Sequence, residues 1–397
     1  MIKTLGDARV VFGFLNRLGM SLSDPVEVRG AKAYDPRDAW SISPFPDGRA
    51  FGFTIVHDAD QAYSRRLAPL FAVFDECGLK ITVTAFVFWA AWADGRAAWR
   101  QWRQTEAGGD SFFVPECVPL EDDEERKFYL ELSLRGHELG MHTPSDTSSN
   151  REDVVRAFHF FKAHFGRYPS IYVEHRAWTN LDAQAREGSI PGSIYYNRDL
   201  LNSYGPWVWL DDPCGVPHRL HPKFYDILAV NGSPFHNSAA QQYGIRKAFL
   251  RTGKWKEGDG DGFLNHYSEQ RIDALEKHRG LAIVYTHLDK KWLDANTRKM
   301  RAAITDRLKY LASKNGWFVP AGTILDRVQA IHRLKLYHDK RVLKVVNGGS
   351  ENVEGLTIVS NKRRSLRRGA GVLRPATHGD IIIGPIRAGE TLSFEIV

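Results

Sequence analysis

The sequence predicts an α/β fold, either an α/β barrel or a doubly wound sheet, followed by a small all-β domain. Strand patterns alternate with amphipathic helix patterns from about residue 51 to about residue 325. Clusters of polar side chains stand directly after several of the predicted strands, where α/β proteins place their chemistry. After about Arg333 the helix patterns stop, and short β-rich runs separated by turns containing Gly and Asn take over.

The first repeating unit begins with a buried strand over residues 51–56, which form an apolar run. We expect Ser64 to cap the next helix, Gly78 to end it, and the β-branched run 80–88 to form the second strand. The apolar face of the helix has the spacing i, i+3, i+4, i+7 and consists of Leu67, Leu70, Phe71 and Phe74. A strand, a helix and a strand in this order require a parallel pair.

The alternation continues with a helix that Asn150 is expected to cap, with Asp153 three residues later, and that stops before Pro169. Later strands are predicted over residues 170–173, 208–210, 281–285 and 317–319, and then over 342–346, 356–359, 380–383 and 391–396. We therefore expect three parts: a lead segment over residues 1–50 that packs on the barrel, a catalytic α/β domain over 51–330, and a small β-sandwich over 335–397.

Composition indicates a globular protein of ordinary type, with 43% hydrophobic and 25% charged residues. No signal-peptide pattern is present at the N-terminus, and the longest apolar run, residues 83–92, is about half of the roughly 20 residues that a membrane-spanning helix needs. The three cysteines offer no disulfide framework. A reducing, cytoplasmic location is the simplest expectation.

One basic cluster stands out against a modest net charge of +7. It runs from Lys362 to Arg368 and carries Arg363, Arg364 and Arg367 between them. Such a cluster suits a phosphate, an acidic glycan or an anionic membrane surface, although a solvated loop is the commoner explanation. No pattern of a nucleic-acid-binding module surrounds the cluster, so we expect no nucleic-acid partner.

Five polar clusters follow predicted strands, and parallel strands bring such clusters to one end of a sheet. They are His57-Asp58-Ala59-Asp60, His142 to Asp146, Glu174 to Trp178, Asp211-Asp212 and Thr286-His287. Crowded carboxylates stay ionised only where a cation or hydrogen bonds compensate them. Each cluster alone has a structural explanation as a turn, a cap or a core histidine. Their order and shared position favour one functional site instead.

This ordered set resembles the polysaccharide deacetylase family, the carbohydrate esterase family 4-like enzymes with a NodB-homology domain. The matching segments are the strand end with Asp58 and Asp60, residues 76–83, the Gly136-His-Glu-Leu-Gly140 run before His142, Arg176, and the strand that ends in His287. The resemblance covers about residues 51–325 and implies an irregular (β/α) barrel.

The resemblance also implies roles for individual residues. Asp58 would be the general base, Asp60 and His142 metal ligands, His287 the general acid, and Arg176 with Asp211 an orienting pair. A divalent metal lowers the pKa of a water and polarises an acyl carbonyl, and a protonated imidazole suits the departure of an amine near neutral pH. We expect Zn²⁺, with Co²⁺, Mn²⁺ and Mg²⁺ as alternatives.

Two departures from the family pattern leave the metal shell open. The usual second histidine, four residues after the first, is Asp146 here. Asp146 can still bind zinc or a harder metal, or His175 can supply the missing imidazole, and we favour His175. The first motif reads His-Asp-x-Asp, so we expect His57 to contact the ligand residues without binding the metal itself.

Other residues have competing explanations. His137 and His142 imitate a zincin motif, but five residues on a helix turn the second by about 140°, so the two cannot share a metal and His137 is expected to be exposed. Trp178, Tyr195 and Trp209 could stack on the faces of sugars, although each could instead pack in the core.

The expected activity is that of a metal-dependent deacetylase acting on an N-acetyl, less readily an O-acetyl, group of a sugar or glycan precursor. A cytoplasmic substrate suggests a phosphorylated or lipid-linked precursor, and Lys362 to Arg368 suits such a carrier or a peripheral contact with the inner membrane. No obligate protein partner is inferred. Two alternatives stay open: a related amidohydrolase acting on a non-sugar C–N bond, and a non-catalytic glycan-binding homologue that lost its metal through Asp146.

Overall fold

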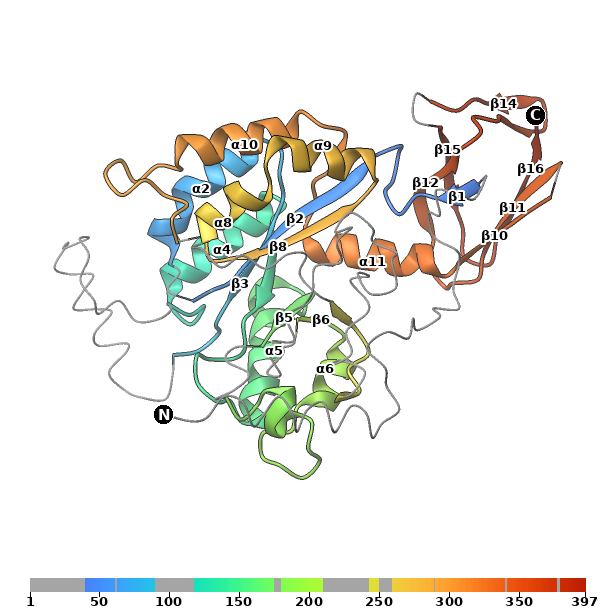
Figure 1. The fold of residues 1–397 in the computed structure, drawn as a ribbon. Coiled ribbons are helices and arrows are strands. Elements are labelled where there is room, and N and C mark those ends of the chain that lie inside the picture. The colour runs from blue at the N-terminus through green and yellow to red at the C-terminus, as the bar shows by residue number, and fades with distance from the viewer. Residues whose placement is uncertain are drawn as a thin grey trace, which may run out of the picture.

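The computed structural model describes residues 40–60, 63–89, 118–174, 180–209, 243–249, 259–288, 290–339, 341–376 and 379–397 (Figure 1). Four residues of the expected site lie outside these ranges: His175, Arg176, Trp178 and Asp211. In the described ranges, no helix combines the length and the apolar character that crossing a membrane requires.

The large sheet of the described chain is a curled half-barrel of parallel strands in the order β7-β6-β5-β4-β3-β2-β8. The strands are β2 (Phe51–His57), β3 (Thr82–Ala85), β4 (Glu138–Met141), β5 (Ile171–Val173), β6 (Trp207–Trp209), β7 (Ala248–Phe249) and β8 (Leu281–Thr286). Each strand from β3 to β7 adds to the same edge, and β8 returns to the other side of β2. The sheet is curled, its strands follow the chain order from β2 to β7, and the last strand lies beside the first, so the barrel prediction is confirmed. The short β9 (Gly316–Trp317) pairs with the start of β2.

Helices connect and cover these strands (Figure 1). They are α2 (Ser64–Glu76), α4 (Asp123–Leu134), α5 (Arg151–Phe165), η1 (Gln184–Gly188), α6 (Arg198–Tyr204), α8 (Asp259–His266), α9 (Glu269–Lys277), α10 (Ala302–Ala312) and α11 (Ala321–His332). The expected apolar face of α2 is buried, and Asn150 caps α5 by accepting the N–H of Asp153. Ser64 is not a cap, because it is the first residue of α2 and its N–H and hydroxyl donate to Glu125.

His137 is buried, which contradicts the expected exposure. Its Nδ1 accepts the N–H of Ile81 at 3.2 Å, and its Nε2 lies 3.1 Å from Oδ1 of Asp75. The residues between His137 and His142 form strand β4 rather than a helix, so the two histidines stand about 16 Å apart at opposite ends of the strand. This separation is why the two histidines cannot share a metal.

The C-terminal domain is the expected β-sandwich. A three-stranded sheet, β1-β12-β15, faces a five-stranded sheet, β10-β11-β16-β13-β14, and every pair is antiparallel. The strands are β1 (Trp40–Ile42), β10 (Leu334–His338), β11 (Val342–Asn347), β12 (Val353–Ser360), β13 (Leu366–Arg368), β14 (Gly371–Leu373), β15 (Asp380–Ile386) and β16 (Thr391–Ile396). The sandwich has its own apolar core, to which Trp40 contributes, whereas Phe45 already packs in the barrel core.

A buried ion pair joins the sandwich to the barrel. Nη2 of Arg279, which lies just before β8, donates to Oδ2 of Asp380 at 2.6 Å, and both side chains are buried. Arg327 of α11 donates to the carbonyl of Gly355 in β12 at 3.3 Å. The sandwich therefore docks near the amino end of β8.

Candidate metal centre

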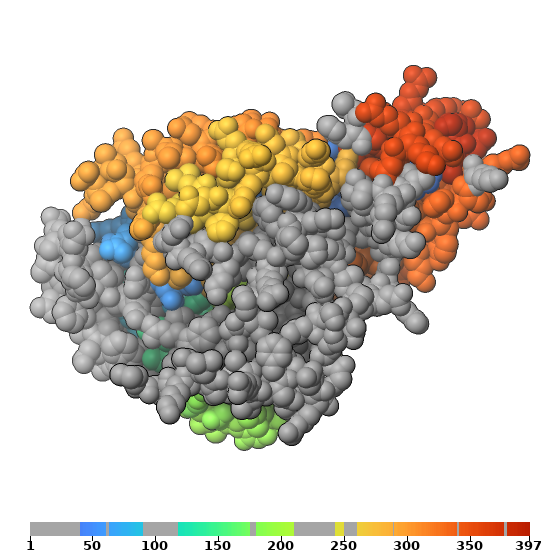
Figure 2. All heavy atoms as spheres, in the orientation of Figure 1, coloured from blue at the N-terminus to red at the C-terminus, as the bar shows by residue number. Residues whose placement is uncertain are grey.

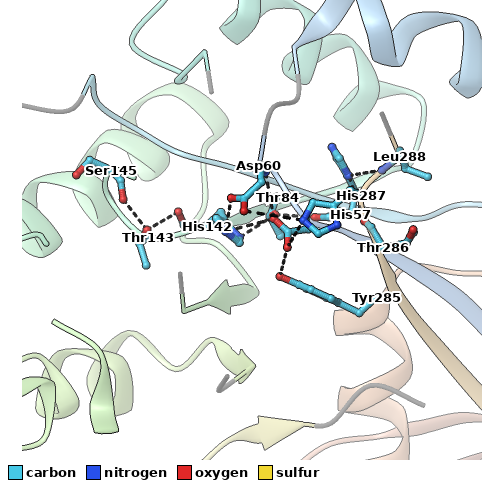
Figure 3. A network of polar contacts seen from close by, with 11 residues as sticks. His57, Asp60, Thr84, His142, Thr143, Ser145, Tyr285, Thr286, His287 and Leu288 are labelled. Atoms are coloured by element: carbon cyan, nitrogen blue, oxygen red, sulfur yellow. Dashed lines mark hydrogen bonds and ion pairs between the residues drawn. The ribbon is translucent and has the colours of Figure 1, made fainter. Parts of the chain in front are cut away.

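The carboxyl ends of β2, β4 and β8 bring the predicted site residues together (Figure 3). In the pair of β2 with β8, His57 stands opposite Thr286, and the N–H of Asp58 donates to the carbonyl of Thr286 at 2.9 Å. On the other side, the N–H of His142 donates to the carbonyl of Ala85 in β3 at 2.9 Å. The first residues after these strands are thus fixed by the sheet itself.

Asp58, Asp60 and His142 form a group that could hold a metal ion, with one ligand atom of each within 4.8 Å of the others. Nε2 of His142 lies 3.5 Å from Oδ1 of Asp58 and 3.5 Å from Oδ1 of Asp60. Two ligands on a tetrahedral metal at about 2.1 Å stand roughly 3.4 Å apart. The spacing and the mixed oxygen and nitrogen donors therefore fit a divalent metal.

The imidazole of His142 is oriented by its neighbours. The hydroxyl of Thr84 donates to the carbonyl of His57 at 2.6 Å, so its oxygen is left to accept from Nδ1 of His142, 3.4 Å away. The edge of the Phe86 ring packs against the imidazole, with the centroids 4.8 Å apart. A proton on Nδ1 leaves the lone pair of Nε2 facing the two carboxylates, which is the tautomer that ligation requires.

The two oxygens of Asp58 have different neighbours. Oδ1 accepts the N–H of Asp60 at 3.1 Å and faces His142. Oδ2 accepts the phenol of Tyr285 at 2.8 Å and lies 3.0 Å from Nε2 of His287. Burial alone would raise the pKa of Asp58, but the imidazoles of His142 and His287, when protonated, attract the carboxylate and hold its pKa well below its ordinary value. Asp58 is therefore ionised at neutral pH.

His57 is wholly buried behind the ligands, and burial lowers the pKa of its imidazole to about 3. Its Nδ1 accepts the N–H of Leu288 at 3.2 Å. The same Nδ1 lies 3.4 Å from the carbonyl of Thr286 at the end of β8. The neutral ring ties the turn after His287 to the end of β2.

The remaining site predictions are not all placed by the structure. Asp146 is buried in the loop after His142, but among the described residues it does not join the group of ligand atoms within 4.8 Å. Because His175 lies outside the described residues, the choice between these two ligands stays a prediction. Trp209 is 4% exposed and stacks on Tyr285 at 4.2 Å, so one face of its indole is covered. Tyr195 is half-buried in the segment before α6.

Two residues of this centre were not expected from the sequence. Tyr285 could have been found, because it lies two residues before His287 in a strand and therefore points to the same face. Thr84 carries no comparable signal, since it is one of several β-branched residues in the second strand. Its role depends on the register between β3 and β4, which pairs it with Gly140.

Comparison with known proteins adds similar structures but no family assignment. No family model matches the sequence, and no curated protein matches it. The similar solved structures include a probable polysaccharide deacetylase from Pseudomonas aeruginosa PAO1, with 11% identity, coverage of 70% of this chain and 89% of that chain, and a TM-score of 0.38. Puue allantoinase has 11% identity, coverage of 73% and 94%, and a TM-score of 0.39.

BA3943 from Bacillus anthracis, described as a CE4 family pseudoenzyme, has 12% identity, coverage of 71% and 67%, and a TM-score of 0.31. At these identities and TM-scores the three structures leave the activity of this chain open. The candidate metal centre is identified from this chain itself. The half-barrel presents two aspartates and a histidine at metal-ligand spacing where its strands end.

Proposed function

We propose that the chain is a metal-dependent amide hydrolase that removes the acetyl group from an N-acetylated sugar or glycan precursor, and less readily an O-acetyl group. One observation carries the proposal: Oδ1 atoms of Asp58 and Asp60 both lie 3.5 Å from Nε2 of His142, while Oδ2 of Asp58 is bound separately by Tyr285 and His287. Asp58 therefore keeps Oδ1 beside the ligand atoms of Asp60 and His142, where it can accept a proton, while Oδ2 stays bound by Tyr285 and His287.

The roles of the residues follow from these contacts. Asp60 and His142 hold the metal, which when bound activates a water and polarises the acyl carbonyl. Asp58 is ionised and accepts a proton on Oδ1, while its Oδ2 stays bound to the phenol of Tyr285. His287 has a partly exposed side chain beside Asp58 and delivers the proton to the leaving amine.

Zn²⁺ is the metal that we propose, because the carboxylate of Asp60, the imidazole of His142 and one further protein ligand suit a four-coordinate zinc site with an open position. Co²⁺, Mn²⁺ and Mg²⁺ remain alternatives, since oxygen ligands also suit the harder ions. His175 is our choice for the further protein ligand, with Asp146 as the alternative. Arg176 and Asp211 are proposed to orient the base and the acid.

The substrate is proposed from the chemistry around the site. Trp178 and Tyr195 are the aromatic side chains that we expect to contact the sugar, whereas Trp209 is buried against Tyr285. A phosphorylated or lipid-linked precursor in the cytoplasm, or at the inner membrane, would be the source of that sugar. No nucleic acid and no obligate protein partner enter this proposal.

The test combines metal analysis with product analysis. The purified protein should contain metal and should release acetate from N-acetylated sugars after addition of Zn²⁺, Co²⁺ or Mn²⁺. Asp58→Asn should abolish the release while the metal stays bound. Loss of the metal in that variant would instead make Asp58 a ligand.

Two other results would replace the proposal. Release of ammonia or a urea derivative from ureides, without acetate from sugars, would identify an amidohydrolase acting on a non-sugar C–N bond. Absence of both metal and product, together with retained glycan binding, would identify a non-catalytic homologue.

A further inference from the structure

A basic-apolar patch lies on the C-terminal sandwich. It consists of Lys362, Arg363, Arg364, Arg367, Arg368, Val372 and Val397, all of which are exposed. Residues 362–374 contain six Lys or Arg and no Asp or Glu, so the segment carries concentrated positive charge. Val372 and Val397 expose 45% and 42% of their surface, and few large apolar side chains of the described chain are so open.

The sheet holds these residues at one edge. β14 is the outermost strand of the five-stranded sheet, and the register places Arg367 opposite both Val372 and Glu395. The main chain of Val397 exchanges two hydrogen bonds of 3.0 Å with Ser365, which directly follows the first three cations. Arg367 and Val372 are therefore cross-strand neighbours at this edge, and Val397 lies beside the strand that carries Arg367 and Arg368.

Within the part of the chain that the structure describes, Glu395 forms an ion pair with the patch. Nη1 of Arg367 lies 3.1 Å from Oε2 of Glu395, and this exposed ion pair is weak in water. The guanidinium of Arg368 lies 5.9 Å from the centroid of the Phe394 ring, which orients the side chain and keeps its charge. The patch thus presents a net positive surface to any partner.

The patch stands apart from the metal centre. Arg279 binds Asp380 of the sandwich just before β8, whereas His287 follows the other end of that strand, about 20 Å away. The C-terminal residues form a lobe that projects from the barrel (Figure 2). A partner of the patch would therefore leave the metal centre uncovered.

We propose that the basic-apolar patch binds the surface of a bilayer that contains anionic lipids. Cations are attracted by the negative potential of such a surface, and aliphatic side chains gain free energy by entering the interface between headgroups and acyl chains. A single-stranded nucleic acid would be bound by aromatic side chains between the cations, and the exposed apolar side chains here are valines. The inference stands independently of the proposed deacetylase activity, and would bring that activity close to a lipid-linked substrate.

Vesicle sedimentation with the full chain tests the proposal. Binding is expected to vesicles of phosphatidylcholine with phosphatidylglycerol, not to phosphatidylcholine alone, and should weaken at high ionic strength. Each cation near the surface contributes about a fivefold change in affinity. A variant that reverses four charges should bind at least a hundredfold more weakly: Arg363→Glu, Arg364→Glu, Arg367→Glu and Arg368→Glu.

The control reverses the same amount of charge on the barrel. Its substitutions are at exposed positions: Lys127→Glu, Arg167→Glu, Lys277→Glu and Lys299→Glu. The control should bind the anionic vesicles within about threefold of the natural protein, because its altered charges lie outside the patch. Equal losses in both variants would show that only total charge matters, and would overturn the proposal. Circular dichroism of each variant checks that it is folded.

Val372→Ser separates a bilayer from a soluble polyanion. The valine should matter only where an apolar layer is present, so this variant should bind anionic vesicles severalfold more weakly and bind inorganic polyphosphate as before. If Val372→Ser leaves vesicle binding unchanged, or if the natural protein binds polyphosphate and no vesicles, the partner is a soluble polyanion and the proposal fails.

Discussion

The phenol of Tyr285 donates a hydrogen bond of 2.8 Å to Oδ2 of Asp58, and joins the strand that ends in His287 to the strand that ends in the paired aspartates. Trp209 stacks on the same phenol ring at 4.2 Å, although β6 and β8 are far apart in the order of the strands. The stacked pair therefore spans the interior of the barrel. It restrains the rotation of Asp58 and keeps Oδ1 directed towards His142.

Removing this phenol should affect turnover more than metal binding. Tyr285→Phe deletes one hydrogen bond to an ionised group, which is worth about 1.5–3 kcal/mol. We expect kcat to fall by roughly tenfold to a hundredfold at unchanged KM, because only the orientation of the base is lost. Steady-state kinetics and metal content together check this. A fall in metal content would mean that Tyr285 shapes the ligand group instead.

Metal binding should depend on Asp60 and His142, the two residues that we propose as metal ligands. Asp60→Ala and His142→Ala should each lose the bound metal, measured by elemental analysis and by calorimetric titration with Zn²⁺. His175→Ala should also weaken binding by a large factor, and Asp146→Ala should not. If Asp146→Ala weakens metal binding and His175→Ala does not, the further ligand is Asp146.

His57 should stabilise the turn that carries His287. His57→Leu leaves the N–H of Leu288 without its acceptor, and an unsatisfied buried group costs about 1–3 kcal/mol. The free energy of unfolding in urea should fall by this amount, and the amide of Leu288 should exchange hydrogen faster. His57→Asn is the matched control, because its Oδ1 can accept in place of Nδ1 and should restore most of the loss.

Stability should fall as the pH rises towards neutrality because of Glu125. Its carboxylate is buried beside Ser64, and burial raises the pKa to about 7 from an ordinary value of 4.5. The folded-state pKa lies above the unfolded one, so the folded protein binds the extra proton between about pH 4.5 and about pH 7 and loses that stabilisation as the proton leaves. At pH 8 the cost is at most about 3 kcal/mol.

Glu125→Gln removes this titration. The free energy of unfolding in urea should be measured at pH 5 and at pH 8. Relative to the natural protein, Glu125→Gln should be more stable at pH 8 than at pH 5. Glu124→Gln, at an exposed neighbouring position, should show no such gain. A constant difference between Glu125→Gln and the natural protein at both pH values would contradict the prediction.

The ion pair between the two domains gives a separate prediction. Asp380→Ala leaves the buried guanidinium of Arg279 without its carboxylate, which should cost about 3–5 kcal/mol. The double variant Arg279→Met, Asp380→Leu should recover much of this loss, because no buried charge remains. Urea unfolding of the single and double variants checks both statements. If the single variant is as stable as the double variant, the guanidinium of Arg279 has found another partner.

Periodicity in the sequence was enough for most of the elements. The helix face of Leu67, Leu70, Phe71 and Phe74 and the cap at Asn150 are confirmed, because their causes are local: apolar spacing and a side chain that accepts a nearby N–H. The prediction that Ser64 is a cap was wrong, since Glu125, 61 residues away in the chain, takes its hydrogen bonds. A long-range partner of this kind has no signature in a window of sequence.

His137 shows the same limit. A helical interpretation of the segment turned His137 away from His142 and suggested an exposed side chain, yet Asp75 and the N–H of Ile81 satisfy both ring nitrogens inside the protein. A histidine is buried at little cost only where its partners are supplied by other elements. These partners come from helix α2 and from the residue before β3, more than 50 positions away in the chain, so sequence alone could not predict the burial.

The sequence by itself determined that a βαβ series places aspartates and histidines after its strands, because strand and helix periods and the polarity of residues at strand ends are local properties. Only the tertiary structure decided the order of the strands, and with it which polar groups meet. The 3.5 Å contacts of His142 with Asp58 and Asp60, and the hydrogen bond from Tyr285, depend on hydrogen-bonded register between strands. Register is set by the packing of the whole sheet, in which residues more than 200 positions apart become neighbours.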